Sequence, residues 1–224
     1  MVKKIVGTGV LLVLALALQA GVKMYTLKSP DGKVKLEVTA GQGIAYSLFY
    51  DGRLLLKPSR IALHTDLPEA DHWENIRITG TKQRHVSETV QAPFYRVKEF
   101  GIDCNELELR LNNGFSLLMR AYNDGMAYRF VAGRKGEMTV VEERAEFNFA
   151  DDFEAYIPYS TNPKDPWNMA FQNFYTKAPL TQYNTELPAF LPLTVDVGAV
   201  KLTLLESDLE AYPGMFVCGD GKTP

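Results

Sequence analysis

The acidic residues near the end of the chain are the ones best suited to do chemistry. Glu206 follows a run of strand-forming residues over Val200–Leu205, and Asp208 and Glu210 come at alternate positions after it. Carboxylates gathered at the end of a strand can bind a hard cation such as calcium, which takes several oxygen ligands. A solvated acidic loop explains the same residues, and no EF-hand pattern is present. Composition alone therefore leaves a cation site and a solvated loop open.

An aromatic segment earlier in the chain could bind a sugar. Its aromatic and amide side chains are Trp167, Phe171, Gln172, Asn173, Phe174 and Tyr175. Aromatic faces pack on the C–H surface of a pyranose, while amides bond its hydroxyls. The alternative is a short helix, capped by Asp165 with Pro166 at its first position, that buries one apolar face on a sheet. The candidate substrate-binding residues are Trp167, Asn173 and Tyr175.

Other catalytic groups lack a supporting pattern. No Gly-x-Ser-x-Gly elbow or glycine-rich phosphate loop occurs, which argues against nucleophilic hydrolases and nucleotide enzymes. His64, His72 and His85 have no neighbour that would make one of them a base, so we expect solvated or hydrogen-bonded surface histidines. Cys104 precedes an alternating strand, which predicts a buried free thiol, and neither cysteine has the spacing of a zinc ligand.

The elements that position these groups are strands. In Lys33–Thr39 apolar residues alternate with charged ones, as in a half-buried strand. Asp51-Gly52 and Asn123-Asp124-Gly125 predict hairpin turns. Further strands are expected at Ile44–Tyr50, Arg53–Leu56, Ile102–Leu111, Phe115–Tyr122, Met126–Val131, Thr139–Phe149, Phe153–Ile157, Leu191–Val197 and Val200–Leu205. Many antiparallel strands at short spacing predict an all-β, sandwich-like fold.

The N-terminus is typical of a secretory signal peptide. Lys3 and Lys4 precede the apolar run Ile5–Leu18, which is too short to span a membrane, and Ala20 offers a cleavage site. We therefore expect a signal peptide over 1–20 and one β-domain over 21–224, exported to the periplasm or the extracellular space. The net charge of −3 and the pI near 5.7 argue against nucleic acid and against an anionic membrane surface.

Read in order, several short motifs cover nearly all of the mature chain. They are Ser29-Pro30-Asp31-Gly32, Tyr50-Asp51-Gly52, Arg120–Phe130, Asp165-Pro166-Trp167, Asn173-Phe174-Tyr175, Glu206-Ser207-Asp208-Leu209 and Tyr212-Pro213-Gly214-Met215. The ordered set resembles the N-terminal domain of glycoside hydrolase family 97, the calcium-dependent α-glucosidases and α-galactosidases. The resemblance implies a β-super-sandwich similar to the mutarotase-like N-terminal domains of other glycosidases.

The resemblance also implies that this domain packs on a catalytic (β/α)8 barrel and contributes a residue to its active site. In the family the glutamate that matches Glu206 reaches across to the barrel and ligates the active-site calcium, and the barrel supplies the acid and base carboxylates. The substrate would be an α-linked oligosaccharide. No barrel sequence is present, and the family continues beyond the match to Pro224. We therefore expect an N-terminal domain truncated at its C-terminal end, which alone neither hydrolyses glycosides nor binds calcium usefully.

Two alternatives assign no catalysis to the chain. One is a free-standing carbohydrate-binding module that uses the segment from Trp167 to Tyr175. The other is a structural β-domain that docks on a separately encoded barrel. Either would keep the β-fold and change only the partner.

Overall fold

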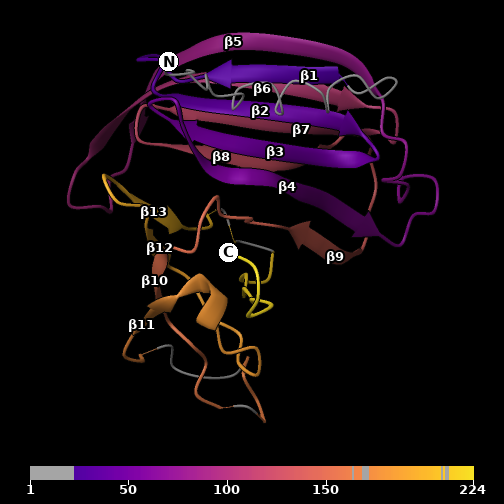
Figure 1. Cartoon of the computed structure of the whole chain (residues 1–224). Coiled ribbons are helices and arrows are strands. Elements are labelled where there is room, and N and C mark those ends of the chain that lie inside the picture. The colour runs from indigo at the N-terminus through magenta and orange to yellow at the C-terminus, as the bar shows by residue number, and fades with distance from the viewer. Residues whose placement is uncertain (1–22, 163, 168–171, 208, 210–211) are drawn as a thin grey trace, which may run out of the picture. The chain divides into compact units, whose positions relative to one another are not determined.

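The computed structural model describes residues 23–162, 164–167, 172–207, 209 and 212–224. The chain divides into two compact units, each described by itself below (Figure 1). Unit 1 contains the described residues up to Gly52 together with Ser59–Glu146, and unit 2 contains Arg53–Pro58 and Phe147–Pro224. Across the described residues, no helix has the length and apolar character needed to cross a lipid bilayer.

Unit 1 is a sandwich of two antiparallel sheets. The first sheet has the order β1 (Lys23–Lys28), β2 (Val34–Gly41), β3 (Gly43–Tyr50), β4 (Arg53–Thr65) and β9 (Val140–Ala145). The second has the order β5 (Ile78–Gln91), β6 (Glu99–Leu111), β7 (Phe115–Tyr122) and β8 (Gly125–Ala132). Strands β1 and β2 of the first sheet contact β6 and β7 of the second, and Figure 1 shows the two layers face to face.

The core of unit 1 follows from period-two alternation in its central strands. In β2 and β3, Leu36 is paired with Leu48, and both side chains are buried. In the other sheet Leu109 is paired with Leu117, and both are fully buried. Because directly opposed residues lie on the same face of a sheet, the apolar faces meet in one interior. The all-β prediction is confirmed, as are the expected strands at these positions.

Two turns that carry motifs of the resemblance are joined in unit 1. The Ser29 hydroxyl donates to the Asp31 carboxylate (2.6 Å), and the Val34 N–H donates to the Ser29 hydroxyl oxygen. Gly32 in the same turn has φ +76°, a left-handed conformation that glycine adopts without strain. The Asp31 N–H then donates to Asn123 Oδ1 at 3.0 Å. These polar residues therefore fix two hairpin connections to each other.

The second sheet carries a charged cluster on the face opposite its leucines. Glu106 is 4% exposed, and its two carboxylate oxygens accept hydrogen bonds from Arg84 Nε (2.6 Å) and Arg120 Nε (2.8 Å). The three residues stand opposite one another on β5, β6 and β7. A buried carboxylate is costly unless it is paired, and here both of its oxygens are.

Unit 2 is built on a third sheet. Its order is β11 (Thr176–Pro179), β10 (Glu154–Ile157), β12 (Leu193–Asp196) and β13 (Lys201–Leu204), and a short 3-10 helix, η2 (Leu180–Gln182), follows β11. All pairings are antiparallel. Ala155, Ile157 and Val195 are fully buried at its centre. The first residues of β4 belong to this unit, where Leu56 forms a bridge with Phe149.

The C-terminal segment is tied into unit 2 by Tyr183. The Tyr183 hydroxyl donates to the Val217 carbonyl oxygen at 2.8 Å, and the Leu187 carbonyl oxygen lies 3.1 Å from the same hydroxyl. Val217 also exchanges two backbone hydrogen bonds with Ala189, each 2.9 Å long. Burial raises the pKa of Tyr183, which therefore stays a neutral donor. Val217 is thus hydrogen-bonded to the unit through both Tyr183 and Ala189.

The cysteines and histidines match the expectations from sequence. Both cysteines are free, with Cys104 buried and Cys218 exposed. His64 Nδ1 lies 2.7 Å from Asp71 Oδ1, and the exposed His85 lies within hydrogen-bond distance of Asn105. These contacts are those of hydrogen-bonded surface histidines.

Candidate functional site

Glu206 lies two residues after the end of β13 and is held by the turn that comes after the acidic loop. Its Oε1 and Oε2 both accept the N–H of Met215, at 3.0 and 2.8 Å. A Cβ added to Gly214 would lie 3.5 Å from Oε1, so the turn passes close to the carboxylate. Hydrogen bonds to an ionised acceptor are stronger than neutral ones. The Tyr-Pro-Gly-Met turn therefore fixes the direction of the Glu206 side chain.

This geometry fits one ligand of a cation. Met215 supplies a single proton, whereas the two carboxylate oxygens of Glu206 offer about four lone-pair positions. The side chain is also only partly buried. Within the described ranges, no group of three or more His, Cys, Asp or Glu side chains is arranged to hold a metal. Asp208 and Glu210 lie outside the described residues.

Trp167 is joined to the same turn as Glu206. Its indole is 59% exposed and meets the Phe216 ring edge to face, with centroids 4.8 Å apart and planes at 87°. Phe216 comes directly after Met215, which holds Glu206. The structure therefore brings Trp167 and Glu206 to one short segment, with much of the indole left open to solvent.

Asn173 and Tyr175 lie just before β11. Asn173 Nδ2 donates to the Tyr159 carbonyl oxygen at 2.7 Å, so its donor serves to anchor the segment. The Tyr175 side chain is 45% exposed, and the neighbouring Phe174 is fully exposed. Among the residues described, no side-chain hydrogen bond or ring contact joins Asn173 or Tyr175 to Trp167 or Glu206. The three candidate sugar contacts stay a prediction.

The short helix was expected from Pro166 onward, with Trp167, Ala170, Phe171 and Phe174 at helical spacing. Residues 168–171 lie outside the described residues, and the described residues on either side, 166–167 and 172–174, are not helical. The described residues on either side of 168–171 are hydrogen-bonded to the segment that follows β10. The Ser160 hydroxyl donates to the Pro166 carbonyl at 3.0 Å, and Asn173 bonds Tyr159 as described above. Pro166 and Asn173 are thus bonded to two adjacent residues, Ser160 and Tyr159.

Sequence reasoning did not identify Met215 and Phe216 as part of this site. Met215 appeared only as the last residue of the Tyr212-Pro213-Gly214-Met215 motif, and Phe216 was not singled out. The available signal was the Pro213-Gly214 pair, since such a turn sends the chain back toward the strand it has just left.

Comparison with known proteins gives this site a context. A family model described as Glycosyl-hydrolase 97 N-terminal matches residues 27–224. A curated retaining alpha-galactosidase of Bacteroides thetaiotaomicron is 40% identical over 209 residues, which are 90% of this chain and 31% of that protein. A probable retaining alpha-galactosidase of Streptomyces bingchenggensis is 26% identical over 158 residues, 69% of this chain and 24% of that protein. The chain thus spans less than a third of these relatives.

Solved structures support the fold. A crystal structure of a beta-arabinopyranosidase aligns with a TM-score of 0.66 at 21% identity, covering 78% of this chain and 30% of the other. A family 97 enzyme of Pseudoalteromonas sp. strain K8, solved in complex with panose, aligns with a TM-score of 0.62 at 19% identity, covering 88% and 31%. The match to the family model extends over nearly the whole described chain. The chain belongs to the glycosyl-hydrolase 97 N-terminal family.

Proposed function

We propose that this chain is the N-terminal domain of an exported, retaining α-galactosidase-type glycoside hydrolase that acts on α-linked oligosaccharides. The observation that carries the proposal is its similarity, over most of its length, to the Bacteroides retaining alpha-galactosidase. The chain spans only 31% of that relative. The resemblance to family 97 implies that hydrolysis takes place on a catalytic (β/α)8 barrel, to which this domain would be joined. Export is proposed from the signal-peptide pattern of residues 1–20.

In this proposal Glu206 contributes one carboxylate to a calcium ion at the active site. Its orientation by the Met215 N–H supports the role, because a ligand fixed before the metal arrives loses less conformational freedom on binding. A bound calcium ion would stabilise developing negative charge and orient the carboxylates around it. The remaining ligands come from the barrel.

The bond-breaking carboxylates are not expected in this chain. Retaining glycosidases use two carboxyl groups roughly 5 Å apart, one as nucleophile and one as acid and then base. Trp167, with its exposed indole, and Tyr175 would contribute a sugar-binding surface beside that machinery. This domain would thus bind and orient the substrate rather than cleave it.

A domain exchange tests the proposal. This chain would replace the corresponding N-terminal part of the Bacteroides α-galactosidase, and hydrolysis of a chromogenic α-galactoside would be measured. We expect activity in the chimera and none in the relative from which that part has simply been deleted. A folded chimera without activity would contradict the proposed role.

A free-standing carbohydrate-binding module is the second candidate. Exposed Trp167, Phe174 and Tyr175 within one segment favour it. It predicts saturable binding of malto-oligosaccharides to the full chain and loss of that binding in Trp167→Ala. Tyr95→Ala, which removes an exposed aromatic side chain in unit 1, is the matched control and should bind as the wild type does. Equal binding by all three proteins would rule out this use of Trp167.

A further inference from the structure

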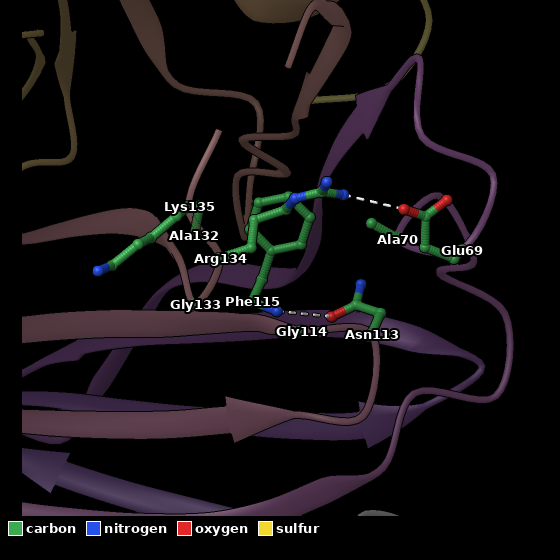
Figure 2. Close-up of a pocket in the computed structure, with 9 residues that line it drawn as sticks. All are labelled: Glu69, Ala70, Asn113, Gly114, Phe115, Ala132, Gly133, Arg134 and Lys135. Carbon is green, nitrogen blue, oxygen red and sulfur yellow. Dashed lines mark hydrogen bonds and ion pairs between the residues drawn. The ribbon is translucent and has the colours of Figure 1, made fainter. Parts of the chain in front are cut away.

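Unit 1 contains a pocket of about 330 Å³ that is separate in sequence from every residue of the candidate site. Three connections line it: Glu69 and Ala70 after β4, Asn113–Phe115 between β6 and β7, and Ala132–Lys135 after β8 (Figure 2). Its volume is at the small end of the range for ligand pockets, so it suits a molecule no larger than a monosaccharide.

Asn113 contributes a buried donor without a partner. The residue is 4% exposed, and its Oδ1 accepts the Phe115 N–H at 3.3 Å, which closes the turn. Its Nδ2 has no hydrogen-bond partner. Figure 2 shows Nδ2 pointing away from the turn, toward the space between Arg134 and Ala70. Buried donors are nearly always satisfied, so the pocket lacks one acceptor.

The charges around the pocket indicate what kind of acceptor fits. Arg134 Nη1 is paired with Glu69 Oε1 at 2.9 Å. Lys135 also lines the pocket and forms no ion pair with any described residue, and Figure 2 shows its side chain pointing away from Asn113. Among the described residues, the buried side-chain atom of the lining that has no hydrogen-bond partner is a donor, Asn113 Nδ2. Arg134 already donates a hydrogen bond to a carboxylate, that of Glu69, so its guanidinium can bind a carboxylate at this position.

We propose that this pocket binds a small molecule bearing a carboxylate, such as a sugar acid or a simple organic acid. One carboxylate oxygen would take the place of Glu69 on Arg134, and the other would accept the free Nδ2–H of Asn113.

The Arg134–Glu69 pair occupies the position that the ligand carboxylate would take. It lies across the space above Asn113 in Figure 2, and Nδ2 is shielded from solvent. The Glu69 side chain is 67% exposed and that of Arg134 40% exposed. Because exposed ion pairs are weak, an incoming carboxylate can displace Glu69. The Phe115 ring, stacked on Trp73 with centroids 6.1 Å apart, gives the wall a fixed position.

Calorimetric titration of the full chain tests the proposal with three probes: D-galacturonate, acetate and D-galactose. We expect galacturonate to bind and galactose, which has the same ring without the acid, not to bind. Acetate binding would assign the site to carboxylates in general, and its absence would assign it to sugar acids. Failure of both acids to bind, or equal binding of galactose and galacturonate, would overturn the proposal.

Two variants with matched controls assign any binding to this pocket. Asn113→Asp keeps the acceptor for the Phe115 N–H but removes the free donor and adds a repelling charge, so we expect binding to weaken about tenfold or more. Asn112→Asp makes the same change at the neighbouring position, whose Oδ1 accepts the Arg77 N–H outside the pocket lining, and should have little effect.

Glu69→Gln removes the competing carboxylate and should tighten galacturonate binding several-fold, whereas Glu74→Gln, an exposed change in the same connection, should not. This second pair of variants does not depend on the Asn113 turn, so it stays informative if Asn113→Asp fails to fold. Unchanged affinity in both Asn113→Asp and Glu69→Gln would place the ligand elsewhere. The outcome is independent of the proposed function, which concerns residues of unit 2.

Discussion

The charged cluster of the second sheet makes a sharp prediction about stability. Glu106→Gln keeps the size of the side chain and removes the charge shared by Arg84 and Arg120. Breaking a fully buried pair costs roughly 3–5 kcal/mol, whereas an exposed pair is worth roughly 0–1 kcal/mol. Glu106 is buried but the Arg120 side chain is 24% exposed, so water compensates part of the loss. We expect Glu106→Gln to lower the free energy of unfolding by about 2 kcal/mol.

In the full chain, the change in the free energy of unfolding can be followed with a fluorescence probe that lies in unit 1. The chain has two tryptophans, Trp73 in unit 1 and Trp167 in unit 2. In a Trp167→Phe background, urea unfolding followed by fluorescence reports the surroundings of the buried Trp73. Glu108→Gln is the matched control on the same strand, because Glu108 meets the exposed Arg110 at 3.5 Å. Its effect should stay below about 1 kcal/mol.

The effect of Glu106 should also depend on pH. Burial raises the pKa of Glu106, but the hydrogen bonds from Arg84 and Arg120 outweigh it, so the pKa lies below its ordinary value of 4.5. A carboxyl with a depressed pKa in the folded state stabilises the fold above its unfolded pKa, and this is lost as the pH falls through the folded pKa. The difference between wild type and Glu106→Gln should therefore shrink below about pH 4.5. Equal effects of Glu106→Gln and Glu108→Gln at neutral pH, or a difference unchanged in acid, would refute this reasoning.

Three further predictions concern residues outside this cluster. Gly219→Ala places a Cβ 2.5 Å from the Tyr183 ring, so urea unfolding should show a loss of about 1–3 kcal/mol, whereas Gly101→Ala, which meets nothing within 4 Å, should cost far less. A thiol reagent should modify only Cys218 in the native protein and both cysteines in urea, because Cys104 is buried and burial raises the pKa of its thiol; rapid native labelling of Cys104 would contradict its packing. Thr223→Val should raise the Asp220 pKa from about 2 toward 3.8 in an NMR titration, since hydrogen bonds from Thr223 and Lys222 depress it, and an unchanged pKa would show that these bonds do not form.

The sequence predicted the strands that have one buried face. Phe115–Tyr122 was expected and is β7, because burial of every second residue leaves a clear period of two. Strand β5 was not predicted, although it has 14 residues, because Val86 is its only buried residue and the alternation is missing. Strand β5 is an edge strand whose place is set by pairing with β6, and pairing partners leave no local pattern. The division into two units also left no signal, because it falls inside β4 and not in a linker.

Some residues of the candidate sites could also be predicted from local sequence, and others could not. Glu206 could be singled out because a carboxylate at the end of a strand is visible in the sequence, and the resemblance gave it a role. Its hydrogen bond to Met215 depends on a turn that brings back a residue nine positions later. The free donor of Asn113 arises only where three connections meet in space. No local pattern of residue types predicts that three connections distant in sequence lie side by side.

The role of Glu206 is tested most directly by calcium titration of the chimera with the Bacteroides catalytic domain. Activity would be followed against free calcium for the wild type, Glu206→Gln and Glu186→Gln, the last an exposed glutamate of the same unit. In Glu206→Gln the side-chain amide oxygen would still accept the Met215 N–H, so the turn should persist while the charge is lost. We expect Glu206→Gln to need at least tenfold more calcium for half-maximal activity and Glu186→Gln to match the wild type. Identical calcium curves for all three proteins would contradict the assignment of Glu206 as a calcium ligand.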